Sequence, residues 1–266
     1  MSTTQYYPTD LTEAQWTRLL ALLPARKWRP GGPGRPPCDL RQVLNGIFYL
    51  LKTGCQWRMV PREFGKWNTI YAYFKAWRQA GVWAKLMDAL RQSERRRQGR
   101  QAEPSAGSVD SQSIKTATQA TEVGFDGGKQ VKGRKRHLLV DTLGLIIAVV
   151  VTAANTDDRV GLMLLLAQYF VSGVKRLRQL WVDGGYQAVW LAQWVRDLKQ
   201  TYKIDLAVTS HKGQGFQVVP WRWAAERTFA WLLNDRRHSR DYERLTVNSA
   251  AMIQLSMIRL LLNRLA

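Results

Sequence analysis

Apolar and polar positions along this chain follow one spacing before residue 100 and another after it. In the first part, apolar residues recur every three or four positions, the spacing of one helix face. One run begins at Leu11 and stops before Pro24. A second follows Asp39, a suitable N-cap, and stops at Gly54. A third begins near Asn68. Three short helices joined by tight turns are typical of a helix-turn-helix unit, whose last helix reads DNA.

The aromatic stripe of the third helix also fits a small helical bundle in which Trp and Tyr form the core. Basic and polar residues on its other faces favour DNA binding, and we expect Asn68, Lys75 and Arg78 to contact DNA. A loop rich in Pro and Gly contains Arg35 and is either a basic strap along DNA or a plain connection. The Arg-rich segment 91–100 is interpreted as a helix end and a solvated linker.

After residue 100, short apolar runs alternate with longer helical stretches, which is an α/β pattern. A turn at 141–144 joins two runs as a hairpin, and a helix is predicted from about 156 to 170. Three adjacent strands followed by helix–strand alternation predict a mixed, ribonuclease H-like sheet flanked by helices. We therefore divide the chain into an all-helical, helix-turn-helix-like DNA-binding domain at 1–100 and a catalytic α/β domain at 101–266. The predicted strands are 108–112, 137–141, 145–152, 180–183 and 205–208.

The charge of the chain points to a partner. Its 266 residues contain 40 Lys and Arg against 20 Asp and Glu, a formal net charge of +20, which favours a polyanion and nucleic acid first. Residues 1–100 are the more basic part, with 18 Lys and Arg against 6 Asp and Glu. A membrane-surface protein would need an amphipathic basic helix or a lipidation signal, and the first residues show neither. Without a signal-peptide pattern, and with two Cys, we expect a cytoplasmic protein with reduced thiols.

Three carboxylates stand where the predicted fold could bring them together. Asp110 lies in the first predicted strand, Asp183 ends the fourth, and Glu226 lies on a later helix. Carboxylate oxygens suit Mg²⁺ or Mn²⁺, and two such ions can clamp the attacking and leaving oxygens of a phosphoryl transfer. With three His in the chain, a His-based metal site is hard to assemble. Each acid alone has a structural alternative, namely a strand-end contact with amides for Asp110, a turn for Asp183 and an ion pair with Arg222 for Glu226.

Longer motifs occur in one order along the chain. They are GCQWRMVP at 54–61, WNTIY at 67–71, VDSQS at 109–113, KGRKRH at 132–137, VDGGY at 182–186 and ERTFAWL at 226–232. Together they resemble the DDE transposases of bacterial insertion sequences, particularly the IS-five-type group, over nearly the whole chain. The resemblance implies that Asp110, Asp183 and Glu226 are catalytic and hold two Mg²⁺ or Mn²⁺ ions.

The resemblance extends to residues near the glutamate. Related transposases place an Arg four residues before it, which is Arg222 here, and we expect Arg222 to stabilise phosphate charge. Their Lys and Tyr have no counterpart, since Leu233 and Val219 occupy those positions. Arg236 or Arg237 would then approach the same phosphate.

The resemblance also implies the partners. It predicts an enzyme that binds double-stranded DNA at terminal inverted repeats, hydrolyses the ends and joins the freed 3′ hydroxyls to target DNA. Two ends must meet, so we expect a homodimer on DNA, without a membrane, in the bacterial cytoplasm at the nucleoid. An apolar helix around 252–262 is either core or interface. The basic residues in or beside the first hairpin are expected to bind DNA, or else to form a solvated loop: Lys132, Arg134, Lys135 and Arg136.

Two alternatives stay open at this point. One is a nuclease of the same fold that cuts without joining. The other is a non-catalytic DNA-binding regulator derived from a transposase, against which the intact set of three acids argues.

Overall fold

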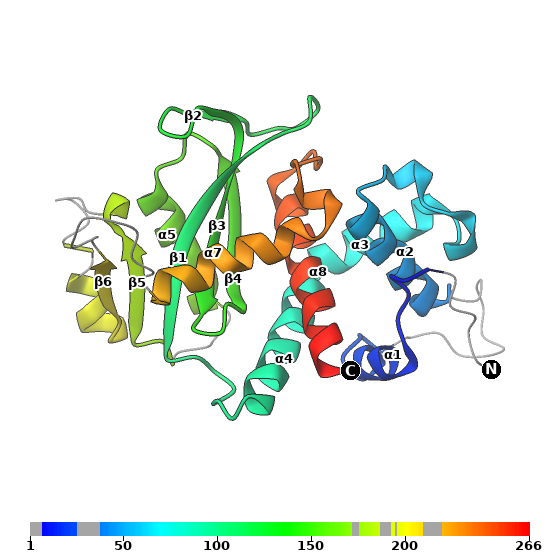
Figure 1. The fold of residues 1–266 in the computed structure, drawn as a ribbon, viewed down its shortest axis with the longest axis horizontal. Helices are drawn as coiled ribbons and strands as arrows, with labels where there is room; N and C mark the ends of the chain where they lie inside the picture. Colours follow the sequence, from blue (N-terminus) through cyan, green and yellow to red (C-terminus); the bar gives the residue numbers. More distant parts are fainter. Residues whose placement is uncertain (1–6, 26–37, 172–175, 187–192, 195, 210–219) are drawn as a thin grey trace.

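The computed structural model describes residues 7–25, 38–171, 176–186, 193–194, 196–209 and 220–266, the side chains of residues 185, 209 and 220–222 excepted. Helices form the N-terminal part, and a sheet flanked by helices forms the rest (Figure 1). This mixed α/β architecture confirms the predicted fold class. The N-terminal part consists of α1 (Glu13–Leu20), α2 (Leu40–Thr53), the short 3₁₀ helices η1 (Trp57–Met59) and η2 (Arg62–Phe64), α3 (Trp67–Gln79) and α4 (Val82–Arg97).

Local signals in the sequence fix where the first helices begin and end. Thr12 and Gln15 form a capping box at the start of α1, each side chain accepting from the backbone N–H of the other residue. Asp39 caps α2, its carboxylate accepting from the N–H of Arg41 at 2.8 Å. Gly54 follows α2 in the left-handed conformation, with φ 72°, as glycine often does at a helix C-terminus. The boundaries predicted at Asp39 and Gly54 are confirmed.

One mixed sheet forms the centre of the C-terminal part. Its order is β2-β3-β1-β5-β6, and β4 also pairs with β3. Strands β2, β3, β4 and β1 pair antiparallel, whereas β5 and β6 continue parallel to β1, which is the expected ribonuclease H-like layout. The sequence pattern does not predict β2, because three residues are too few to show an alternation. The strands are β1 (Ala106–Lys115), β2 (Gly124–Asp126), β3 (Val131–Asp141), β4 (Ile146–Ala153), β5 (Gln179–Asp183) and β6 (Asp205–Thr209).

Helices cover both faces of the sheet (Figure 1). On one face, α5 (Asp158–Val171) packs against β3 and β4 over an apolar core that contains Leu139. On the other, α7 (Pro220–Leu233) and α8 (Thr246–Leu265) pack over a second core that contains Leu138. Consecutive residues of a strand point to opposite faces, so β3 contributes to both cores. Among the described helices, none combines the length and apolar character needed to cross a membrane.

The C-terminal helix α8 joins the two parts of the protein. It contacts α1, α2, α3 and α4 as well as β4 and α7. Its residues Met252, Ile253 and Leu261 are buried in the same core as residues of α2 and α4. The apolar helix near the C-terminus is therefore core, and this core runs across the boundary predicted at residue 100.

The Arg-rich end of α4 differs from the expected solvated linker. The helix continues to Arg97, and Arg91 and Arg95 are buried on it. The guanidinium of Arg95 pairs with the carboxylate of Asp141 and donates from Nε to the carbonyl of Gln101 at 2.9 Å. The charged run was expected at the surface, but Arg95 can be buried because it pairs with Asp141, which is distant in the sequence.

Candidate active site

Asp110 and Asp183 lie on neighbouring parallel strands. The pairing of β1 with β5 aligns Ser108 with Trp181. Asp110 and Asp183 each follow two residues further along, so they occupy matching positions on one face of the sheet, on strands about 4.8 Å apart. The two carboxylates are therefore placed where both could ligate oxygen-preferring cations.

Glu226 lies on α7, the helix that crosses β1, β3 and β5 (Figure 1). Its side chain is exposed, while the neighbouring Ala225 is buried. Arg222 lies one turn earlier on α7, and its side chain falls outside the described part of the structure. Among the described residues, no group of three His, Cys, Asp or Glu side chains is close enough to hold a metal ion. The fold thus aligns Asp110 with Asp183 and sets Glu226 on the helix across their strands, without closing a three-acid cluster.

Two side chains next to Glu226 attach α7 to the sheet. Thr228 donates its hydroxyl to the carbonyl of Gly144 at 2.7 Å, and Arg227 donates to the carbonyl of Leu143 at 2.9 Å. Gly144 has φ 78°, and a Cβ there would lie 3.0 Å from the Thr228 hydroxyl, so this turn requires glycine. The motif that begins with Glu226 therefore sets the position of the glutamate. The sequence interpretation missed this role, although both residues stand inside the motif.

Tyr186 lies three residues after Asp183, in the 3₁₀ turn η3 (Gly184–Tyr186), and is buried in the core under α5. Burial raises its pKa well above the usual value, and the charges of Asp158, Asp110 and Asp183 raise it further. The hydroxyl is therefore protonated at neutral pH, and it has no hydrogen-bond partner within the described residues. The VDGGY motif contains this tyrosine, but spacing alone did not single it out.

A second group of polar side chains surrounds Ser111, the residue after Asp110 on β1. Ser111 donates its hydroxyl to Asp158 at 2.7 Å, and the ammonium of Lys135 lies 3.2 Å from the same carboxylate. Lys129 donates from Nζ to the carbonyl oxygen of Ser111 at 3.0 Å. The start of α5 and the β2–β3 hairpin are thereby attached to β1, and a lysine ammonium lies against the residue after Asp110.

Comparisons with known protein families decide what kind of protein carries these acids. A family model described as a transposase DDE domain matches residues 101–261, and one described as a putative transposase of the IS4/5 family matches residues 11–87. The chain belongs to the transposase DDE domain family. Membership implies an enzyme that cleaves DNA and transfers strands and, in general, uses divalent metal ions. The predicted resemblance is confirmed.

Two proteins of Burkholderia cepacia are similar to this transposase. The insertion element IS402 uncharacterized 16.2 kDa protein is 37% identical over 112 residues, which cover 41% of this chain and 75% of that protein. The putative transposase for insertion sequence element IS402 is 30% identical over 129 residues, which cover 46% of this chain and 60% of that protein.

The residues of the transposase that were predicted to bind DNA differ in exposure. Arg78 is half-buried, and Arg35 lies outside the described residues. For the exposed ones, DNA contact stays a prediction. These are Asn68, Lys75, Lys132 and Arg236.

Four other predicted DNA contacts are buried inside the transposase. β3 pairs with β1 on one edge and with β4 on the other, and helices cover both of its faces. The basic run on this strand is therefore enclosed, and its charges bond to other parts of the chain. Arg237, which lies after α7 and not on this strand, is buried as well. These four side chains do not form the expected DNA surface: Arg134, Lys135, Arg136 and Arg237.

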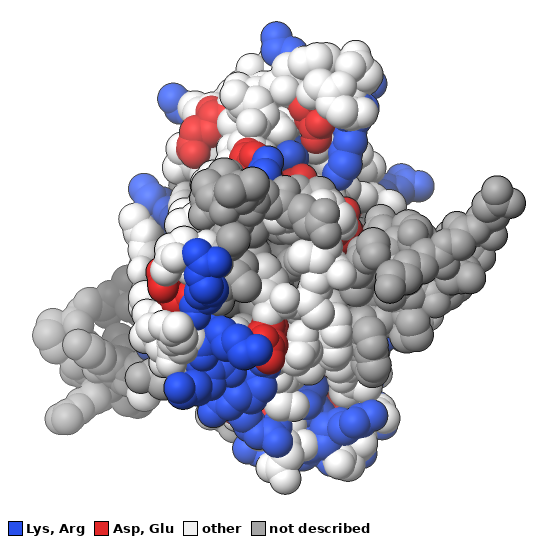
Figure 2. Space-filling view, turned by 90° about the vertical axis from the view of Figure 1, so that its left-hand side faces the viewer, with Lys and Arg blue, Asp and Glu red and all other residues white. Residues whose placement is uncertain are grey.

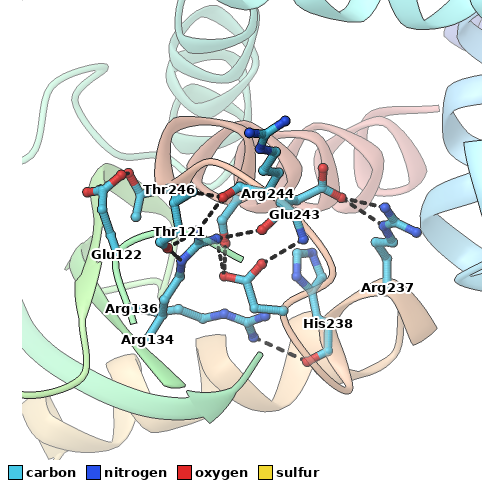
Figure 3. Close-up of polar contacts among 11 residues, drawn as sticks. Thr121, Glu122, Arg134, Arg136, Arg237, His238, Glu243, Arg244 and Thr246 are labelled. Atoms are coloured by element: carbon cyan, nitrogen blue, oxygen red, sulfur yellow. Dashed lines mark hydrogen bonds and ion pairs between the residues drawn. The ribbon is translucent and has the colours of Figure 1, made fainter. Parts of the chain in front are cut away.

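Arg134 forms a junction between the sheet and the segment after α7 (Figure 3). It donates to the carbonyl oxygens of Thr121, Glu243 and Arg244 at 2.5, 2.8 and 2.6 Å, and it pairs with the carboxylate of Asp241 at 3.3 Å. All five hydrogens of a guanidinium need acceptors when it is buried, and backbone carbonyls supply most of them here.

Two further arginines belong to the same buried network. Arg237, in η5 (Arg236–His238), donates to Glu243 at 2.6 and 2.9 Å and to the carbonyl of Cys55 at 2.8 Å. Arg136 donates to the carbonyl of His238 at 3.2 Å (Figure 3). Burial lowers the pKa of Arg136 to about 10, so it remains charged at neutral pH. These charges brace the fold, which leaves DNA contact to other cations.

Exposed cations are present elsewhere on the transposase. Figure 2 shows Lys and Arg side chains gathered over the lower part of the face that it presents. Arg100 precedes β1, and Arg176 and Arg178 precede β5, and all three are exposed. Because β1 and β5 are parallel and start side by side, Arg176 and Arg178 lie at the end of the sheet where these strands begin, and Arg100 lies on the segment that leads into the same end. This end of the sheet offers a basic surface of the kind that attracts DNA phosphates.

Proposed function

We propose that the transposase binds the terminal inverted repeats of its insertion sequence, hydrolyses DNA at those ends and joins the freed 3′ hydroxyls to target DNA. The matching position of Asp110 and Asp183 on neighbouring parallel strands carries this proposal, together with Glu226 on the helix that crosses those strands. Their donor set consists of carboxylate oxygens, which fits two Mg²⁺ or Mn²⁺ ions. Such ions, when bound, supply charge compensation at the phosphate and activate water.

The chain's own residues divide the remaining work in this proposal. Thr228 and Arg227 hold α7, and with it the glutamate, against the sheet. The protonated hydroxyl of Tyr186 donates a hydrogen bond to an oxygen at the site. Arg222 and Lys129 supply positive charge to the DNA backbone beside the acids.

A homodimer on DNA belongs to the same proposal, since two ends must be held together for joining. We assign the apolar side chains of α8 to the core and not to this interface, because most of them are buried. We place the protein at the nucleoid, where its DNA is.

The first prediction tests the three acids. We expect Asp110→Asn, Asp183→Asn and Glu226→Gln each to lower cleavage by about a hundredfold or more, because each removes a charged ligand while keeping its volume. Binding to the element end should change by less than about twofold. Asp205→Asn is the matched control, since this exposed acid pairs with Lys199 and lies at the first residue of β6, whereas Asp183 aligns with the last residue of that strand, Thr209. Cleavage and strand transfer are measured with Mg²⁺ on oligonucleotides that carry the element end, and binding is measured by gel shift.

The wild-type protein in the same assay separates the alternatives. Cleavage without any joined product would indicate a nuclease of this fold. End binding without cleavage would indicate a regulator. A triad variant that cuts at the wild-type rate would remove that residue from the site.

A further inference from the structure

A cleft of about 730 Å³ lies between the N-terminal helices and the segment that follows α7. Its N-terminal wall comes from two of the sequence motifs, through Trp57, Arg58, Trp67 and Tyr71. The opposite wall comes from residues 237–248. The proposed cleavage chemistry uses none of these aromatic residues, so the motifs that contain them need another explanation.

The N-terminal wall is aromatic and fixed in place. The ring of Trp57 meets that of Tyr71 edge-on, with centroids 5.0 Å apart. Trp67 is 36% exposed, and the guanidinium of Arg58 lies 5.6 Å from its ring centroid. A half-exposed tryptophan at the mouth of a cleft provides a flat apolar surface on which another planar group can stack.

The charge of the cleft is positive. Arg237 pairs with Glu243 inside the wall at 2.6 Å, so this pair contributes little net charge. Arg58 and Arg244 are exposed, and neither takes part in an ion pair within the described residues. Two arginines beside aromatic rings form a surface that suits an anion attached to a planar group.

The network of Figure 3 makes the C-terminal wall rigid. Arg134 bonds the carbonyl of Arg244, and the N–H of Thr121 donates to the same carbonyl at 2.9 Å. On the other side, a Cβ at Gly54 would lie 3.2 Å from the backbone of Arg236, so only glycine lets the two walls meet this closely. The cleft therefore exists before any ligand binds, which lowers the entropic cost of binding.

We propose that this cleft binds one nucleotide that has left the base stack of the bound DNA. Its base stacks on Trp67 and Tyr71, and its phosphates lie against Arg58 and Arg244. The volume falls within the range of small-molecule sites. This inference rests on the proposed function and adds a second DNA contact to it.

The position of the cleft defines which nucleotide it receives. Ala117, in the cleft wall, lies seven residues beyond Asp110 along β1 and its extension. Because β1 is a continuous strand to Lys115 and Thr116 continues it as a bridge to Asp241, the chain rises by about 3.3 Å per residue here and the two positions lie roughly 23 Å apart. This separation corresponds to about six or seven stacked nucleotides of one strand, so the bound nucleotide is distant from the phosphate that is cut.

The test compares single-stranded and double-stranded probes on the full-length protein. A fluorescent ten-nucleotide oligothymidylate and a fluorescent 20-base-pair duplex are titrated by anisotropy. We expect Trp67→Ala to weaken oligothymidylate binding about tenfold, because stacking on an aromatic ring is lost, and to weaken duplex binding less than about twofold. Trp67→Phe keeps a ring and should stay within about threefold of the wild type.

Arg244→Ala provides a second, exposed site that does not depend on core packing. It should weaken oligothymidylate binding more than Arg96→Ala, which removes the same charge from an exposed position on α4. Two results would overturn the inference by showing only general attraction of DNA to a basic surface. One is an equal loss of affinity for both probes in Trp67→Ala, and the other is an equal loss of oligothymidylate affinity in the two arginine variants. Unchanged oligothymidylate binding in Trp67→Ala and Arg244→Ala would overturn it as well. Wild-type cleavage of the element end, measured on the same preparation, shows separately whether the proposed function holds.

Discussion

At the residue scale, two buried tyrosines differ in whether the hydroxyl group is hydrogen-bonded, and this difference distinguishes a stabilising side chain from one with a proposed catalytic role. Tyr169 and Tyr186 are each 2% exposed and lie in the same apolar core. The hydroxyl of Tyr169 accepts from the N–H of Leu177 at 3.0 Å, whereas that of Tyr186 has no partner among the described residues. A buried hydroxyl without a partner costs stability, so its presence beside Asp110 and Asp183 suits a role in the reaction.

Replacing each tyrosine by phenylalanine should therefore have opposite effects. We expect Tyr186→Phe to raise the free energy of unfolding by about 1 kcal/mol, since it removes an unbonded hydroxyl, and to slow cleavage severalfold. Tyr169→Phe should lower the free energy of unfolding by about 1 kcal/mol, because the N–H of Leu177 loses its acceptor. Urea denaturation and single-turnover cleavage measure the two effects. A destabilised Tyr186→Phe protein would show that its hydroxyl is bonded in the folded state.

At the element scale, the sequence predicts what depends on local signals. The caps at Asp39 and Gly54 define α2, and the apolar runs define β1, β4 and β5 to within a few residues. The alignment of Asp110 with Asp183 also follows from strand order, once β1 and β5, the first and fourth of the predicted strands, are recognised as neighbours.

The burial of charged side chains by partners far away in the sequence could not be predicted. The basic run on β3 has the composition of a surface segment, yet Arg134 finds its acceptors more than a hundred residues away, at Asp241 and Arg244. Arg95 is also buried by a partner far away in the sequence, because Asp141 lies 46 residues later, on β3. Without a view of these partners, a run of charges is assigned to solvent.

Two adjacent arginines of α4 test this explanation. We expect Arg95→Ala to lower the free energy of unfolding by about 3 kcal/mol, because it leaves the fully buried Asp141 without its cation. Arg96→Ala, at an exposed position one residue later, should change the free energy of unfolding by less than about 0.5 kcal/mol. Thermal and chemical denaturation compare the two. If both variants are equally stable, the Arg95–Asp141 pair does not stabilise the fold, and the end of α4 behaves as the solvated linker that the sequence predicts.

A glycine of α5 links this helix to β3. A Cβ at Gly161 would lie 2.1 Å from Nδ1 of the buried His137, so α5 can approach β3 only with glycine there. Gly161→Ala should lower the free energy of unfolding by about 2 kcal/mol, although alanine favours an isolated helix by about 1 kcal/mol. Gly127→Ala is the control, since no described atom lies within 4 Å of the added Cβ. Combining Gly161→Ala with His137→Ala should recover part of the loss; a purely additive double variant would contradict the clash.

At the scale of the whole molecule, the N-terminal helices and the catalytic part share one core. α8 supplies apolar side chains to α2 and α4 and also packs on β4. Arg237 adds a polar link by donating to the carbonyl of Cys55, two residues after the end of α2. The DNA-binding surface proposed for the helices is therefore held in a fixed position relative to the acids, which a flexible linker would not achieve.

The last prediction follows from this shared core. Residues 1–100 alone should not fold, because removing α8 exposes the apolar faces that α2 and α4 turn toward it, and a helical unit of this size has little stability to lose. The fragment should show no cooperative thermal transition and should bind a hydrophobic dye, whereas the full chain melts cooperatively. A variant in which residues 246–265 are fused to the fragment through a flexible linker should recover a cooperative transition. If the fragment melts cooperatively by itself, the boundary predicted at residue 100 is a true domain boundary, and DNA binding can be separated from the catalytic part. If only the fusion does, α8 is the element that makes the two functions inseparable.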